Sequence, residues 1–264
     1  MLTVLFPVYE LDKFLQTAIE SIKNQSYKNF TCIILTRELN EDEIISIKNI
    51  ISDDKRFTIH QLKLDGIAFA LNYGLNIVNT KYVARMDADD ISHPLRFEKQ
   101  IKFLEDNPNH VLIGCRVKII DEFNIETNQK FKFFQGNNKI RRALKYRMPL
   151  CHPALIFRTK TLLENRGYMY GTTSEDHEIY IRIARNSENL FENLSENLFS
   201  YRKRPNQLTD MKNAYQSFAD ISGFLFTEFL RTYNLLYLVG IFANHPFLRK
   251  FRSYYRKFKV FILR

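Results

Sequence analysis

Three aspartates stand close together directly after a short apolar run. The run covers residues 82–86, and Asp87, Asp89 and Asp90 follow it. In an extended chain residues two apart point to the same side, so Asp87 and Asp89 would lie on one side of the chain. Such carboxylates repel each other unless a cation lies between them, and Mg²⁺ or Mn²⁺ takes oxygen ligands of this kind. The spacing indicates a metal site, and the alternative is an acidic turn that caps a helix starting near Pro94.

A second pair of carboxylates, Glu175 and Asp176, follows Ser174. Ser174 has the residue type of a helix N-cap, which would place both acids in the first turn, where the helix dipole favours negative charge. A carboxylate at such a place can take a proton from a hydroxyl group, so one interpretation is a general base. The other is plain helix capping.

The elements that must position these acids alternate along the chain. Apolar runs predict strands at 2–6, 30–35, 57–62 and 82–86, and helical spacing of apolar residues predicts helices at 12–25, 41–51 and 67–78. This order predicts an α/β fold with a mostly parallel sheet and right-handed crossovers. With the strand order 3-2-1-4, the first and fourth strands are neighbours, and Pro7 and Tyr9 would face the same crevice as Asp87 and Asp89.

The chain has neither a G-x-G-x-x-G nor a G-x-x-x-x-G-K-[ST] motif. A glycine-rich loop therefore does not hold the phosphates of a bound nucleotide. A carboxylate-held Mg²⁺ or Mn²⁺ would have to do so, which agrees with the aspartate spacing.

The second half of the chain is less regular. A helix is predicted at 94–107, a strand at 111–120 and an apolar strand that ends near Arg158. The near-repeat at 187–199 is interpreted as a surface turn that leads into a strand ending at Arg202. From Asp210 onward the pattern is helical and aromatic. The longest apolar run there, 235–243, is half of the roughly 20 residues that span a bilayer, so no transmembrane helix is predicted.

The net charge of +10 requires an anionic partner such as nucleic acid, a phosphorylated small molecule or an acidic membrane surface. The excess is concentrated at the C-terminus, because residues 241–264 contain seven Lys or Arg and no Asp or Glu. A helix predicted at 251–262 has an apolar arc with basic flanks, which suits an anionic membrane surface. The alternative is a terminal helix that packs on the core.

Three scattered cysteines, with no C-x-x-C pair, indicate neither a disulfide framework nor a zinc site. The N-terminus lacks the basic region of a signal peptide. A cytoplasmic protein, peripheral on the inner face of the cytoplasmic membrane, is therefore predicted.

Across residues 1–205 the sequence resembles the inverting family-two nucleotide-sugar glycosyltransferases with the GT-A fold, in particular bacterial enzymes of capsule, O-antigen or lipooligosaccharide synthesis. The resemblance rests on short stretches in a fixed order: Phe6-Pro7-Val8-Tyr9, Ser21 to Tyr27, Gly66 to Asn72, Ala84 to Asp90, Pro94 to Glu98, His152-Pro153-Ala154, Ser174-Glu175-Asp176 and Tyr201-Arg202. It implies a GT-A domain at 1–205, with a nucleotide-sugar-binding half at 1–93 and an acceptor-binding half at 94–205. Residues 206–264 would form a helical, basic extension.

The resemblance also implies roles for single residues. Asp87 and Asp89 would form the D-x-D motif and bind Mn²⁺ or Mg²⁺, with Asp89 the more direct ligand. Asp176 would be the catalytic base. The residues that would line the site of a UDP-sugar donor are Pro7, Tyr9, Arg85, Asp87 and Asp90.

The sequence departs from the family pattern at three places. Thr36-Arg37-Glu38 stands where two aspartates and a glycine usually follow the second strand, which puts recognition of the base in question. Leu64 replaces an asparagine. Arg204 replaces a histidine after Tyr-Arg, and an arginine can neutralise a diphosphate without binding metal, so Arg204 is a candidate donor-phosphate ligand.

Three functions are compatible with these features. The first is a metal-dependent hexosyl- or N-acetylhexosaminyltransferase that uses a UDP-sugar and a saccharide or lipid-linked saccharide acceptor. The second is a non-catalytic GT-A-fold subunit of a polysaccharide assembly complex. The third, a nucleic-acid binder, lacks an RRM or zinc signature, so no nucleic-acid partner is predicted.

Overall fold

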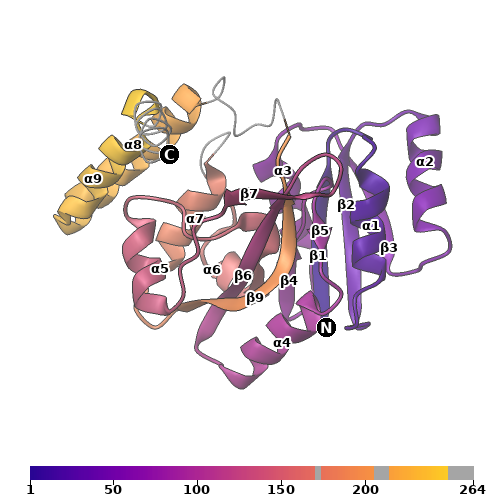
Figure 1. The fold of residues 1–264 in the computed structure, drawn as a ribbon, viewed down its shortest axis with the longest axis horizontal. Coiled ribbons are helices and arrows are strands. Elements are labelled where there is room, and N and C mark those ends of the chain that lie inside the picture. Colours follow the sequence, from indigo (N-terminus) through magenta and orange to yellow (C-terminus); the bar gives the residue numbers. More distant parts are fainter. Residues whose placement is uncertain (170–173, 205–213, 249–264) are drawn as a thin grey trace.

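The computed structural model describes residues 1–169, 174–204 and 214–248, and Figure 1 shows their arrangement around one curved sheet. The strands of this sheet are β1 (Leu2–Val8), β2 (Phe30–Arg37), β3 (Phe57–Leu62), β4 (Tyr82–Arg85), β5 (Ile91–Ser92), β6 (His110–Ile120), β7 (Glu126–Lys130), β8 (Ile156–Arg158) and β9 (Leu190–Arg202). The helices are α1 (Leu15–Lys23), α2 (Glu41–Ile51), α3 (Ile67–Ile77), α4 (Arg96–Asp106), α5 (Asn137–Leu144), α6 (Thr159–Glu164), α7 (Glu175–Ile183), α8 (Ala214–Thr232) and α9 (Leu235–Asn244), with one 3-10 turn, η1 (His152–Ala154).

The strand order confirms the predicted half-fold. The order is β3-β2-β1-β4-β8-β6-β9-β5, with β7 paired to β6, and β1, β2, β3 and β4 are mutually parallel neighbours. The register pairs Leu5 of β1 with Arg85 of β4, the last residue of that strand. The segments that follow β1 and β4 therefore leave the sheet at the same edge.

Helices cover both faces of the sheet. Alternate β1 residues such as Val4 and Phe6 pack under α1, α2 and α4, while Leu5 packs on the other side with α3, α5 and α7. This two-fold alternation lets one strand contribute to two apolar cores. Gly74 of α3 permits the close approach, because a Cβ there would lie 2.6 Å from Leu5 Cδ2.

Buried polar side chains fix the segment after β4. Gln25, which is fully buried, donates from Nε2 to the carbonyls of Ser21 and His93 and to Ser92 Oγ, and its Oε1 accepts the Phe97 N–H. These bonds satisfy backbone groups at the end of α1 and the start of α4 that neither helix can pair internally. The helix predicted near Pro94 begins at Arg96 and has no side-chain N-cap bond, so the aspartates do not cap it.

Two sequence predictions in the second half were incomplete or wrong. The near-repeat at 187–199 is not a surface turn, because β9 already begins at Leu190 and runs for 13 residues beside β6. Its polar residues Ser195, Glu196 and Asn197 lie where the strand is solvent-exposed. The prediction also omitted β5, β7, α5 and α6. The basic helix predicted at 251–262 lies outside the described residues.

Among the described residues, no helix combines the length and hydropathy needed to cross a membrane. The helices α8 and α9 pack against the end of the molecule that carries α5 and α7 (Figure 1). The division of the chain near residue 205 stays a prediction.

Candidate active site

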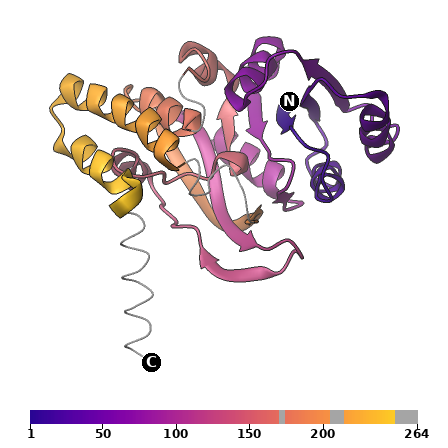
Figure 2. The same cartoon turned by 90° about the horizontal axis from the view of Figure 1, so that it is seen from above.

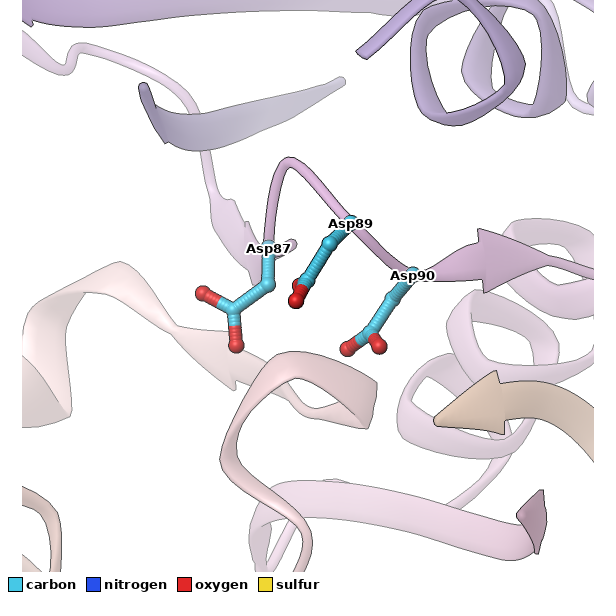
Figure 3. Close-up of side chains that lie close together, drawn as sticks. All are labelled: Asp87, Asp89 and Asp90. Carbon is cyan, nitrogen blue, oxygen red and sulfur yellow. The ribbon is translucent and has the colours of Figure 1, made fainter. Parts of the chain in front are cut away.

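The acidic triplet, Asp87, Asp89 and Asp90, lies on the turn between β4 and β5. One ligand atom from each carboxylate lies within 4.8 Å of the others, and Figure 3 shows the three side chains on the same side of the turn. Asp87 and Asp89 are half-buried and Asp90 is buried. This geometry brings together Asp87 and Asp89, the predicted metal ligands, and places Asp90 beside them.

The triplet suits a hard divalent cation. Asp90 Oδ2 is buried and has no hydrogen-bond partner in the described part of the chain, while Oδ1 accepts the Arg202 N–H at 2.7 Å. Burial, followed by the charges of Asp89 and Asp87, raises the pKa of Asp90 well above its usual range. A cation among these oxygens would relieve both the repulsion and the missing partner.

Two arginines pair with the triplet. Arg85 Nη2 lies 2.6 Å from Asp87 Oδ1, and Arg204 Nε lies 3.3 Å from Asp89 Oδ2. Arg204 Nη1 is also 2.6 Å from Asp12 Oδ2, which anchors this arginine between the β1–α1 segment and the triplet. The structure thus places both predicted arginines at the acidic turn.

A third arginine, Arg202, fixes the backbone of the turn. It is 1% exposed and donates to the carbonyls of Asp89 and Asp121, each at 2.6 Å. A further bond of 2.6 Å goes to Asn124 Oδ1. Since these bonds join β9, the acidic turn and the β6–β7 turn, Arg202 sets where the aspartates stand.

An arginine side chain also holds the backbone carbonyl of Arg85. Arg96 is fully buried and donates to the carbonyls of Arg85 and Pro153 at 2.9 and 3.0 Å. It therefore connects the end of β4 with η1. In η1, His152 bonds Tyr168 Oη at 2.9 Å, and burial lowers the pKa of this histidine well below its usual range, which keeps it neutral.

Pro7 and Tyr9 lie at the end of β1, at the same edge of the sheet. Pro7 is buried and pairs with Leu35 of β2, beyond the last β1–β4 pair. Tyr9 Oη is buried without a hydrogen-bond partner among the described residues, and burial raises the pKa of this phenol. The charges of Arg85 and Asp87 also act on the pKa of Tyr9.

The departure at 36–38 has a structural role. Arg37 donates to the Tyr9 carbonyl at 3.2 Å and to Glu43 Oε1 at 2.9 Å. It therefore ties the end of β1 to the start of α2. Thr36 is buried, and its hydroxyl has no hydrogen-bond partner.

The second carboxylate pair stands at the start of α7. Glu175 is buried and Asp176 is half-buried, with Asp176 Oδ1 accepting the His177 N–H at 2.7 Å. The capping interpretation expected the Ser174 hydroxyl to cap the helix. It does not, because Ser174 Oγ bonds Ser217 Oγ at 2.9 Å instead.

The pair has perturbed acidities. Burial and the charge of Asp176 raise the pKa of Glu175 to about 8. Burial also raises the pKa of Asp176 to about 6, although the hydrogen bond from the His177 N–H acts to lower it. The charges of Arg85 and Asp87 affect the pKa values of both Glu175 and Asp176, so the carboxylate pair interacts electrostatically with the acidic turn. A carboxylate with a moderately raised pKa is suited to accept a proton near neutral pH.

Sequence reasoning named Asp87, Asp89, Asp90, Arg85 and Arg204, and the structure brings all five together. Arg202 and Arg96 occur within the sequence motifs, but no role was predicted for them. Their backbone bonds connect residues far apart in the chain, so local sequence carries no signal of the partners. Asp12 was likewise missed.

Comparisons with known proteins agree with this geometry. Residues 3–167 match the model of the family described as Glycosyl transferase family 2. The chain is 34% identical to the O-antigen biosynthesis glycosyltransferase WbnJ of Escherichia coli, over 88% of this chain and 89% of that protein. It is 36% identical to the amylovoran biosynthesis glycosyltransferase AmsE of Erwinia amylovora, over 45% of this chain and 44% of that protein.

Two solved structures share the fold at 15% sequence identity. One is S. aureus TarS 1-349 in complex with UDP-GlcNAc, with a TM-score of 0.66 over 86% of this chain and 66% of that chain. The other is the mannosyltransferase PcManGT from Pyrobaculum calidifontis in complex with GDP-Man and Mn²⁺, with a TM-score of 0.64 over 92% of this chain and 68% of that chain.

Proposed function

This chain belongs to glycosyl transferase family 2 and has the GT-A fold, and on that basis we propose that it transfers a sugar from a UDP-sugar to a saccharide or lipid-linked saccharide acceptor, with inversion at the anomeric carbon. The observation that carries the proposal is the acidic triplet at the carboxyl end of β4. It stands beside the end of β1 and within the electrostatic reach of Asp176. A donor diphosphate and a proton acceptor would meet there.

Asp87 and Asp89 would hold a divalent cation, Mn²⁺ or Mg²⁺, with the free Oδ2 of Asp90 close by. When bound, such a cation stabilises negative charge on the leaving diphosphate. The complex of PcManGT with GDP-Man and Mn²⁺ supports this choice, because that protein has the same fold. Arg204 pairs with Asp89 and would add a positive charge beside the diphosphate.

The proposed donor-binding residues lie at the same edge of the sheet. Pro7 and Tyr9 would contact the nucleoside, because they follow β1 beside the acidic triplet. UDP is proposed as the nucleotide, and the UDP-GlcNAc complex of TarS supports it. Arg85 would orient Asp87 through the bond of 2.6 Å.

Asp176 is proposed as the general base. The acceptor hydroxyl would lose its proton to Asp176 while its oxygen forms a bond to the anomeric carbon and the bond from that carbon to the diphosphate oxygen breaks. A single displacement of this kind inverts the configuration. The pKa of about 6 leaves Asp176 ionised at pH 7 and basic enough to share the proton in the transition state.

The biological product is proposed from relatives. WbnJ and AmsE are named for O-antigen and amylovoran biosynthesis, and both products are polysaccharides. We propose that this chain likewise extends a surface polysaccharide on a saccharide or lipid-linked acceptor. The site of action would be the cytoplasmic membrane face.

The test is calorimetric titration of UDP in the presence and absence of Mn²⁺. We expect Mn²⁺-dependent heat in the natural protein and its loss in Asp89→Ala. A matched control is Asp106→Ala, which removes an exposed aspartate of α4 that only pairs with Lys102. Full Mn²⁺-dependent binding in Asp89→Ala would remove the metal assignment.

The same titration separates an enzyme from a non-catalytic subunit. A scaffold would show no Mn²⁺-dependent heat with UDP in the natural protein. Hydrolysis of a panel of UDP-sugars then identifies the sugar, and absence of turnover with every donor despite UDP binding would favour the scaffold.

A further inference from the structure

The helices α8 and α9 form a hairpin at the end of the molecule opposite α2 (Figures 1 and 2). We call residues 214–244 the C-terminal hairpin. Its inner side is anchored to the body by Glu228, which is fully buried and pairs with Arg185 at 2.5 Å and with Arg231 at 2.7 Å. In α9, a Cβ at Gly240 would lie 2.3 Å from the Lys145 carbonyl, so α9 packs closely against the end of α5. The hairpin is therefore a fixed part of the fold.

The outer side of this hairpin is apolar. In α8, Phe226 and Leu230 are exposed four residues apart, and Tyr233 is exposed in the turn that follows the helix. In α9 the exposed apolar residues are Leu235, Val239 and Phe242. At 100° per residue the exposed apolar residues of each helix lie together, opposite the buried residues of that helix. The exposed fractions are 49% for Phe226, 53% for Leu230, 80% for Tyr233, 68% for Leu235, 51% for Val239 and 68% for Phe242.

An apolar surface of six large side chains exceeds what scattered surface residues explain, and it marks a surface for interaction. The β6–β7 turn offers a comparison, because only Phe123 and Ile125 are comparably exposed there. The hairpin thus differs by presenting exposed apolar residues on both of its neighbouring helices and on the turn between them.

Charge indicates the partner. Between residues 221 and 264 the sequence has eight Lys or Arg and a single acid, Glu228. Because Glu228 is buried in its ion pairs, it does not offset the positive charge at the surface. Seven of the eight cations belong to residues 249–264, which continue the chain beyond the hairpin.

An apolar face that the sequence continues into a strongly basic segment matches the boundary of a bilayer that contains anionic lipids. A nucleic acid would match the charge but not the exposed apolar residues. A second copy of this chain would match the apolar residues but would pair two chains that both carry this positive charge, and like charges repel. We propose that the outer side of the C-terminal hairpin docks on an anionic lipid bilayer. This proposal concerns binding alone and does not rest on the proposed reaction.

The orientation that docking would impose follows from one contact. Ser217, in the first turn of α8, bonds Ser174 Oγ at 2.9 Å, and Ser174 directly precedes the carboxylate pair of α7. The hairpin is thus attached to the part of the site that carries Asp176. A bilayer on its outer side would lie at this end of the molecule and far from α2.

The experiment is flotation of the full chain with vesicles of phosphatidylcholine alone and with added phosphatidylglycerol. We expect binding to the anionic vesicles, weak binding to phosphatidylcholine, and a decrease at high salt. Phe226→Gln/Leu230→Gln and Val239→Gln/Phe242→Gln should each lower vesicle affinity by roughly tenfold or more. Glutamine preserves helix propensity, so circular dichroism should show unchanged helix content.

A matched control is Phe123→Gln/Ile125→Gln, which removes the same kind of exposed side chains from the β6–β7 turn and should leave binding unchanged. Absence of binding to anionic vesicles by the natural protein would overturn the proposal. So would full binding by both hairpin variants, since the basic segment alone would then account for it. Light scattering that shows a dimer in the natural protein and a monomer in the hairpin variants would assign the surface to a second copy instead.

Discussion

The acidic triplet after β4 and the carboxylate pair at the start of α7 have the same functional groups in opposite surroundings. Arg85, Arg202 and Arg204 all bond to the triplet segment. No salt bridge joins Glu175 or Asp176 to Lys or Arg within the ranges that the structure describes. Asp87 and Asp89 therefore lie beside fixed positive charge, while the α7 pair has a raised affinity for protons.

This difference separates two tasks that one set of carboxylates cannot perform together. Ligands for a cation must stay ionised, whereas a base must take up a proton. Since Asp87 raises the pKa of both α7 carboxylates, a cation at the triplet would also weaken their affinity for protons. The following variants test this division.

The largest effect is expected from Asp176→Asn. The amide has nearly the same shape but cannot accept the proton, so kcat should fall by about 10²–10⁴-fold. Mn²⁺-dependent UDP binding should remain, because the triplet is unchanged. Steady-state kinetics and calorimetry provide the two readouts, and near-normal kcat would place the base elsewhere.

Arg202→Lys tests the positioning of the triplet. A lysine cannot donate to Asp89, Asp121 and Asn124 in the fork geometry of a guanidinium. We expect Mn²⁺-dependent UDP affinity to fall by roughly 10- to 100-fold. The control is Arg56→Lys, which alters a half-buried ion pair with Asp54 at the start of β3. Equal affinities in the two variants would show that Arg202 supports only the fold.

Glu175→Gln tests the proton affinity of the pair. The folded state raises the pKa of Glu175 from 4.5 to about 8, so its contribution to stability is full below about pH 4.5 and is lost as pH rises to 8. Glutamine mimics the protonated acid. Relative to the natural protein, the variant should gain on the order of 3–4 kcal/mol of unfolding free energy between pH 5 and pH 8.

Urea unfolding at several pH values measures this gain, with Glu164→Gln on the exposed end of α6 as control. Activity at pH 7 should persist, because Asp176 remains. Parallel stability profiles for the natural protein and Glu175→Gln would mean that Glu175 is ionised at neutral pH.

The smallest effect is expected from Arg204→Ala. This arginine is partly exposed and pairs with Asp12 and Asp89. Loss of one cation beside the diphosphate should raise the donor KM by about three- to tenfold with little change in kcat. Arg204→Lys keeps the charge and should give an intermediate KM. A lower KM in Arg204→Ala would mean that the arginine competes with the donor.

The N-terminal half of the fold was predictable because its order comes from local patterns. Strand β3 and helix α2 begin and end at the predicted residues, and the order 3-2-1-4 follows from βαβ connections. The second half was less predictable. Strand β9 is interrupted by polar residues such as Asn193, which is buried and donates to the Phe134 carbonyl, a partner that local sequence does not reveal.

The site shows the same contrast. Aspartate spacing indicated the triplet from four consecutive residues, whereas the bonds of Arg202 to Asp89 and Asp90 join positions more than 100 residues apart. Such partners depend on strand pairing between β5 and β9. The pKa values at α7 depend on burial, and local sequence did not indicate that every residue of this helix except Asp176 is buried.

The late position of β9 has a consequence for biogenesis. During synthesis the four parallel strands leave the ribosome well before residue 202, so they are able to associate while the acidic turn still lacks Arg202. Contacts of such long sequence separation form slowly, because a large loop must close first. We therefore expect a nascent polypeptide to form the sheet of β1–β4 before its acidic turn is fixed by Arg202, so sugar transfer would begin only when the chain is nearly complete.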